Sequence, residues 1–178
     1  MPALEQVRAL LLQPLGLDHR EYVEVDYGFR PAFEPEVIEE TEEYLVARNN
    51  RGILTRALKT GTVYGTRMSM DQYLEFPVTV PEDFPPLKQR LVAAQPERYP
   101  ADLEQRILAW RGRTFPLVLG RNAAANGFYW RAREWMGTEN LSLAWHDYPE
   151  LIDQMMEFYA DFTIEVARPI LAETDIDY

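Results

Sequence analysis

The chain has 178 residues, of which 47% are hydrophobic and 12% aromatic, so it can bury a domain-sized core and is too apolar for a disordered segment. Its 18 basic and 29 acidic residues give a formal net charge of −11, which opposes binding to a nucleic-acid backbone or to an anionic membrane surface. With no cysteine and only two histidines, the chain has no disulfide, no thiolate zinc site, no cysteine nucleophile and no histidine-rich metal site.

The N-terminal segment is predicted to form a short helix over residues 3–12, which Pro14 and Gly16 interrupt. This segment lacks the basic start and the cleavage pattern of a signal peptide. No apolar run in the chain approaches the length of a membrane span. We therefore expect a cytoplasmic protein that does not bind membranes.

Residues 20–78 are predicted to contain a small antiparallel sheet. Polar and apolar residues alternate over Tyr22–Asp26, which is consistent with a strand. Residues 41–47 and 52–58 flank the polar turn Asn49-Asn-Arg-Gly52, a pattern typical of a hairpin. The chain becomes extended again over residues 71–78.

Six glutamates between residues 34 and 43 form an acidic run. Such a run can suggest a metal site, but no other residue type nearby supplies a distinct ligand. We interpret the run as a solvated face.

The second half of the chain has the order of an α/β unit. Helices are predicted near residues 86–94 and 102–111. The apolar run Phe115-Pro-Leu-Val-Leu119, bounded by Gly120, indicates a parallel strand buried on both faces. A loop over residues 120–127 and three helical patterns follow it.

The longest helical pattern follows Asp147, which we predict to cap the helix in a capping box with Glu150, with Pro149 in the first turn. Pro169 should kink or end this helix near its last turn. Residues 172–178 then read as the approach to another strand. Seven apolar residues recur at steps of three and four and predict one core face: Leu151, Met155, Phe158, Tyr159, Phe162, Val166 and Ile170.

Several short segments of the chain form a recognisable set: Ser69-Met-Asp-Gln-Tyr-Leu-Glu-Phe-Pro77, Pro81-Glu-Asp-Phe84, Leu87-Lys-Gln-Arg-Leu91, Arg98-Tyr-Pro100, Pro116-Leu-Val-Leu-Gly120, Phe128–Gly137, Tyr148-Pro-Glu-Leu151 and Asp175-Ile-Asp177. They resemble the uroporphyrinogen decarboxylase family, which also includes cobalamin-dependent methyltransferases and many uncharacterised bacterial members. The resemblance covers residues 34–178, and none of its motifs is catalytic.

The resemblance implies an α/β fold, part of a (β/α)₈ TIM-type barrel preceded by the small antiparallel sheet. Because such a barrel takes roughly 250 residues, we expect a single incomplete domain over residues 1–178. Residues 1–80 would form the N-terminal helix and the sheet, and residues 81–178 the helices and the first recognisable barrel βα unit.

The implied activity is either cofactor-free decarboxylation of a carboxylated, tetrapyrrole-like substrate or corrinoid-dependent methyl transfer. The alternative is a non-catalytic fragment or interaction module that needs a partner chain to complete the barrel. The substrate-binding arginines and aspartate of the decarboxylases, and the histidine and cysteine zinc ligands of the methyltransferases, cannot be placed on this chain. We therefore assign no catalytic residue, no metal and no resident cofactor.

The loop after the predicted strand carries the best-placed polar residues, Arg121, Asn122 and Asn126, because barrel enzymes hold their substrates at the carboxyl ends of the strands. Arg121 suits a substrate carboxylate, or it is a surface residue. We expect an acidic small-molecule ligand. We also expect a homo-oligomer or a partner subunit, because half a barrel leaves one side of the strand at residues 115–119 unpaired.

Two further candidates are aromatic or titratable. Trp130, or its neighbour Tyr129, could form the wall of an aromatic pocket, whereas core packing is the alternative for both and for Trp135. His146 is an acid/base candidate, because with its neighbour Asp147 it resembles a base with an orienting carboxylate, although Asp147 is already assigned as a helix cap.

Overall fold

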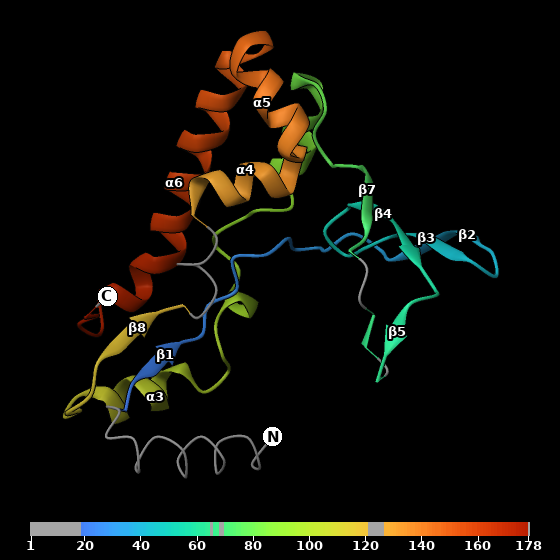
Figure 1. The fold of residues 1–178 in the computed structure, drawn as a ribbon. Helices are drawn as coiled ribbons and strands as arrows, with labels where there is room; N and C mark the ends of the chain where they lie inside the picture. Colours follow the sequence, from blue (N-terminus) through green and yellow to red (C-terminus); the bar gives the residue numbers. More distant parts are fainter. Residues whose placement is uncertain (1–18, 65, 68–69, 121–126, 178) are drawn as a thin grey trace.

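The computed structural model describes residues 19–64, 66–67, 70–120 and 127–177. Within these residues it is a mixed α/β fold with five α-helices, a two-stranded parallel sheet, a four-stranded antiparallel sheet and a short hairpin. Figure 1 shows the helices and the parallel pair together, with the antiparallel sheet set apart from them. No helix in this part of the chain is long and apolar enough to cross a membrane. The helix predicted at residues 3–12 lies outside the described residues.

The parallel sheet consists of β1 (Glu21–Val23) and β8 (Leu117–Leu119), with Tyr22 opposite Val118. Val23 and Leu117 are completely buried. The prediction that the second strand is parallel and interior is therefore confirmed.

The prediction that the first of these strands belongs to the antiparallel sheet is wrong. Alternating residues identify a strand but not its partner, and here the partner is chosen by packing. Val23 of β1 shares a core with Leu117 of β8 and with Ile107 and Trp110 of α3 (Leu103–Trp110). Because of this core, β1 pairs with β8 in the second half of the chain and not with the antiparallel sheet.

The antiparallel sheet has the strand order β2-β3-β4-β7. Its members are β2 (Glu36–Glu40), β3 (Tyr44–Arg48), β4 (Leu54–Leu58) and β7 (Gln72–Glu75). The predicted hairpin is present as β3 and β4. Its turn is closed by Asn49, whose Oδ1 accepts hydrogen bonds from the backbone N of Arg51 at 2.9 Å and of Ile53 at 3.2 Å. All five residues of β2 are exposed, as expected for a solvated acidic run. A separate hairpin is formed by β5 (Thr62–Val63) and β6 (Thr66–Arg67).

The remaining helices form a layer that encloses the larger core. They are α2 (Phe84–Lys88), α4 (Phe128–Met136), α5 (Thr138–Asp147) and α6 (Pro149–Leu171), with 3₁₀ turns at Pro81–Asp83 and Pro96–Arg98. Gly137 joins α4 to α5 at φ +77°, a conformation that favours glycine. The ring of Phe76 packs so closely on Gly137 that a Cβ atom there would clash with it.

The long helix α6 buries six of its seven predicted core residues, and Phe158 is partly buried. Its first two-thirds pack in the larger core and Ile170 packs in the smaller one, so α6 connects the two. Pro169 lies in the last turn and the helix ends at Leu171, as predicted.

The predicted cap of α6 is wrong. Asp147 is the last residue of α5, and the N-cap residue of α6 is Tyr148, which makes no side-chain cap hydrogen bond. An N-cap residue needs non-helical backbone angles, and Asp147 is helical because α5, anchored by buried Leu141 and Ala144, extends to it.

The segment 175–177 lies along β8 on the side away from β1. Pro116 O and Gly120 N form hydrogen bonds with β1. Because successive residues of a strand direct their backbone groups to opposite edges, the N and O atoms of Leu117 face the edge away from β1. There Asp177 N donates to Leu117 O at 3.0 Å, and Leu117 N donates to Asp177 Oδ2 at 2.8 Å. The side of β8 that we expected to be unpaired is therefore occupied at Leu117.

Candidate functional site

The carboxyl ends of β1 and β8 lie side by side because the two strands are parallel and in register. A hydrogen bond of 2.8 Å from Gly120 N to Val23 O closes the pair at this end. The segments that follow both strands leave from this edge, where α/β proteins bind their ligands. Arg121, Asn122 and Asn126 belong to this edge by sequence but lie outside the described residues, so their role stays a prediction.

The segment after β1 is held in place by charged side chains. Asp26 accepts hydrogen bonds from Gly28 N and from Arg30 Nε, both at 2.8 Å. Arg98 is 1% exposed and donates to the carbonyls of Asp26 at 2.8 Å and Gly28 at 3.0 Å. This network fixes the backbone at the carboxyl end of β1.

Arg98 also donates to Val92 O at 2.7 Å and lies 4.7 Å above the ring of Phe162. Burial lowers the pKa of its guanidinium. Sequence reasoning missed this residue because an arginine in a turn carries no local sign that it will be buried. Its partners are backbone carbonyls, so its role is to position the segment after β1.

Trp130 lies on α4 and is 54% exposed, with the guanidinium of Arg133 4.6 Å above its ring. It lines a pocket of about 540 Å³ between α4, the start of α5 and the antiparallel sheet. Tyr73 and Phe76 line the same pocket and are stacked at 5.7 Å. Trp130 thus lines a pocket rather than the core, whereas Trp135 is completely buried.

His146 lies in the last turn of α5 and is exposed. It makes no hydrogen bond or ion pair with the residues that the structure describes. Figure 1 shows the end of α5 at the opposite end of the helical layer from β1 and β8. His146 therefore does not join the strand ends in one site.

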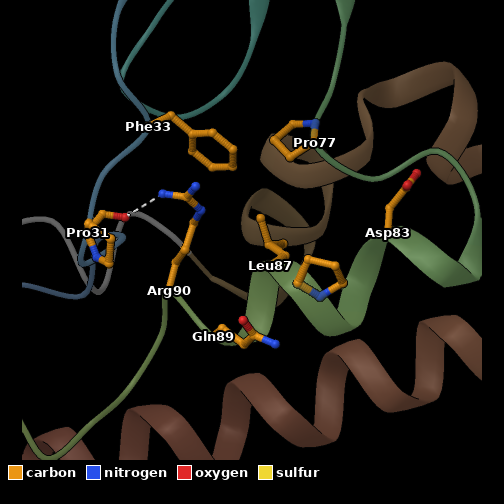
Figure 2. Close-up of a pocket in the computed structure, with 8 residues that line it drawn as sticks. Pro31, Phe33, Pro77, Asp83, Leu87, Gln89 and Arg90 are labelled. Atoms are coloured by element: carbon orange, nitrogen blue, oxygen red, sulfur yellow. Dashed lines mark hydrogen bonds between the residues drawn. The ribbon is translucent and has the colours of Figure 1, made fainter.

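A second pocket, of about 450 Å³, lies between the segment after β1 and the region of α2. Figure 2 shows Arg90 beneath Phe33 on one side of this pocket and Asp83 on the other. The apolar lining residues are Pro31, Phe33, Pro77, Pro86 and Leu87. Sequence reasoning did not identify this pocket, because its two sides come from distant parts of the chain.

Arg90 is fixed before any ligand binds. Its Nη1 donates to Pro31 O at 3.0 Å and to Ala32 O at 3.1 Å, and its guanidinium lies 4.0 Å from the centre of the Phe33 ring. The arrangement can present a positively charged, oriented group to a ligand.

Within the described ranges, no group of three or more His, Asp or Glu side chains is arranged to hold a metal ion. No protein-family profile, curated protein or solved structure matches the chain. The function of the chain must therefore be inferred from its own residues.

Proposed function

We propose that the chain is part of an α/β barrel of the uroporphyrinogen decarboxylase type and acts on a carboxylated small molecule. The reaction would be decarboxylation without a cofactor, or methyl transfer that involves a corrinoid-carrying partner. The parallel register of β1 and β8, with the segment 175–177 bonded to the far side of β8, is the observation that supports this proposal.

The order β1, β8, 175–177 across this sheet is also the order along the chain. In a (β/α)₈ barrel, successive strands are parallel neighbours and helices connect them. Here α4, α5 and α6 connect the second pair, whereas the connection of the first pair contains the antiparallel sheet and the hairpin of β5 and β6 before α2 and α3. The other strands of the barrel would come from a partner chain or from further segments.

Arg121 tests the proposed substrate class. It follows β8 directly, and a fixed positive charge in a chain of net charge −11 favours a specific acidic ligand over a general basic surface. Arg121→Ala should weaken the binding of coproporphyrin or a simple dicarboxylate by about 1.5–3 kcal/mol, the range for a hydrogen bond to a charged group. Isothermal titration calorimetry measures this loss.

The residue substituted as a control must lie at the amino end of β8 and must not stabilise the fold. Arg113 precedes β8 but supports the fold, because it donates to Asp175 O at 2.7 Å and pairs with Asp177 at 2.9 Å. Arg111 is exposed at the same end, so Arg111→Ala is the better control and should bind like the unmodified chain. Equal affinities of the two variants, or no binding by the unmodified chain, would argue against the proposal.

A second candidate function is an interaction module, and exposed apolar side chains favour it. Val37 and Ile38 of β2 are 59% and 51% exposed, and Tyr73 and Leu74 of β7 are 54% and 37% exposed. Both strands are edges of the antiparallel sheet, and exposed apolar edge strands recruit other chains.

Self-association tests this candidate. Light scattering should detect oligomers that dissociate when Ile38 is replaced by lysine, because a charge on an edge strand opposes pairing. A monodisperse monomer at high concentration would contradict an interaction through this sheet between copies of the chain.

A further inference from the structure

Arg90 uses one side of its guanidinium to bond to the backbone of the protein itself. Nη1 donates to two carbonyl oxygens, those of Pro31 and Ala32, which accounts for both of its hydrogens. The stacked ring of Phe33 fixes the plane of the group. Nε and Nη2 donate to no other group among the described residues, and they lie on the side of the guanidinium away from Pro31 in Figure 2.

The Nε and Nη2 donors form a fork that matches the two oxygens of a carboxylate. No carboxylate within the described residues forms an ion pair with Arg90, although the chain has 29 acidic residues. A pre-oriented guanidinium without a carboxylate partner can donate to the carboxylate of an acidic ligand at little cost, because little side-chain ordering remains to oppose binding.

The rest of the pocket suits an apolar body. Pro77 and Leu87 lie across from Arg90 in Figure 2, and Pro86 also lines this cavity of about 450 Å³. This volume falls in the range of small-molecule sites, which are mostly apolar with a few polar groups that orient the ligand. A ligand with one charged end and an apolar remainder fits this lining.

Asp83 determines what the far end of the ligand can carry. Burial raises the pKa of its carboxyl, but hydrogen bonds from Thr79 and Val80 outweigh burial and hold the pKa below its ordinary value. Oδ2 accepts from Thr79 N at 2.9 Å, Thr79 Oγ1 at 2.8 Å and Val80 N at 3.1 Å. The side chain is thus charged at neutral pH and opposes a second carboxylate in the ligand.

We propose that this pocket binds an apolar monocarboxylic acid, whose carboxylate pairs with Nε and Nη2 of Arg90 while its apolar body packs on Pro77, Pro86 and Leu87. The site does not depend on the proposed barrel, since none of its lining residues belongs to β1, β8 or the loop after β8.

Calorimetry with the unmodified chain tests the proposal directly. The probes are 4-phenylbutyrate and its primary amide, which differ at the carboxyl group alone, and octanoate with octanedioate. The acid should bind about 10- to 100-fold more tightly than the amide, as expected for a charged hydrogen-bond pair, and octanoate more tightly than octanedioate. Equal affinity for acid and amide would overturn the proposal.

Arg90→Lys keeps the charge but removes the fork, and should weaken binding of 4-phenylbutyrate about 10-fold while leaving the amide unchanged. Arg111→Ala, an exposed arginine outside the pocket, is the matched control and should change neither affinity. Substitution of Arg90 also removes its hydrogen bonds to the carbonyls of residues 31 and 32. A second measurement therefore uses the unmodified chain.

Modification of Arg90 by phenylglyoxal, mapped by mass spectrometry, should be slowed by the acid and not by the amide; no protection would contradict the assignment.

Discussion

The parallel sheet and the four-stranded antiparallel sheet differ in what covers them. The three-residue strands β1 and β8 each contain a completely buried residue, Val23 and Leu117, because α3 and the end of α6 pack with them. The longer strand β2, by contrast, is exposed along its whole length, as is β7. The contribution of a strand to the core is therefore set by the layer packed on it rather than by its length.

Exposed ion pairs add to the backbone hydrogen bonds that join the strands of the antiparallel sheet. Arg48 pairs with Glu75 at 2.8 Å and Lys59 with Glu40 at 2.7 Å, and Arg51 pairs with Glu134 of α4. Exposed ion pairs each contribute about 0–1 kcal/mol, whereas one buried aromatic side chain contributes several. The helical layer should therefore be the more stable region, and the sheet should open first.

The largest expected effect is in the helical layer. Trp135 is completely buried and its ring lies 5.8 Å from Phe84 and 5.9 Å from Tyr159. Trp135→Ala should lower the free energy of unfolding by about 3–5 kcal/mol, because a large cavity is left in the core. Urea denaturation followed by circular dichroism measures the loss. Trp145→Ala, on an exposed side chain of α5, should cost less than about 0.5 kcal/mol; equal losses would show that the core is not where we place it.

An intermediate effect should appear at alkaline pH. Burial, with the nearby Tyr159 and Tyr99, raises the pKa of Tyr27 from 10.0 to about 12. Because the folded state retains this proton and the unfolded state releases it above pH 10, the stabilisation from Tyr27 is complete below pH 10 and is lost between pH 10 and 12. At pH 11 the loss should be about 1 kcal/mol.

Tyr27→Phe should remove that part of the alkaline decline. At pH 7 the substitution should cost little, because the Tyr27 hydroxyl is buried without a hydrogen-bond partner in the described structure. Chemical denaturation at pH 7 and pH 11 measures both quantities, with Tyr129→Phe on the exposed face of α4 as the control. A variant that declines as steeply as the unmodified chain would contradict the burial of Tyr27.

The smallest expected effect is in the antiparallel sheet. Ile38 is 51% exposed on β2, so Ile38→Ser should change the free energy of unfolding by no more than about 0.5 kcal/mol. Backbone amides of β2 and β7 should also exchange hydrogen faster than those of α6. A loss of 2 kcal/mol or more would mean that the sheet is covered, for example by a second chain, and would remove the difference between the two regions.

The sequence by itself determined the elements whose interactions are local. The core face of α6 and the hairpin of β3 and β4 follow from patterns within a few residues, because helical hydrogen bonds and tight turns join near neighbours. The burial of β8 could also be predicted, because a continuous apolar run places apolar side chains on both faces of a strand, and both faces must then be covered.

Only the tertiary structure decided which distant residues meet. It paired β1 with β8, made Asp147 the end of one helix instead of the cap of the next, and brought Asp177 to Leu117. It also buried Arg98 and oriented Arg90 through carbonyls of residues far away in the chain. Strand pairing and arginine–carbonyl contacts depend on how the cores pack, and packing is a property of the whole chain that no local pattern contains.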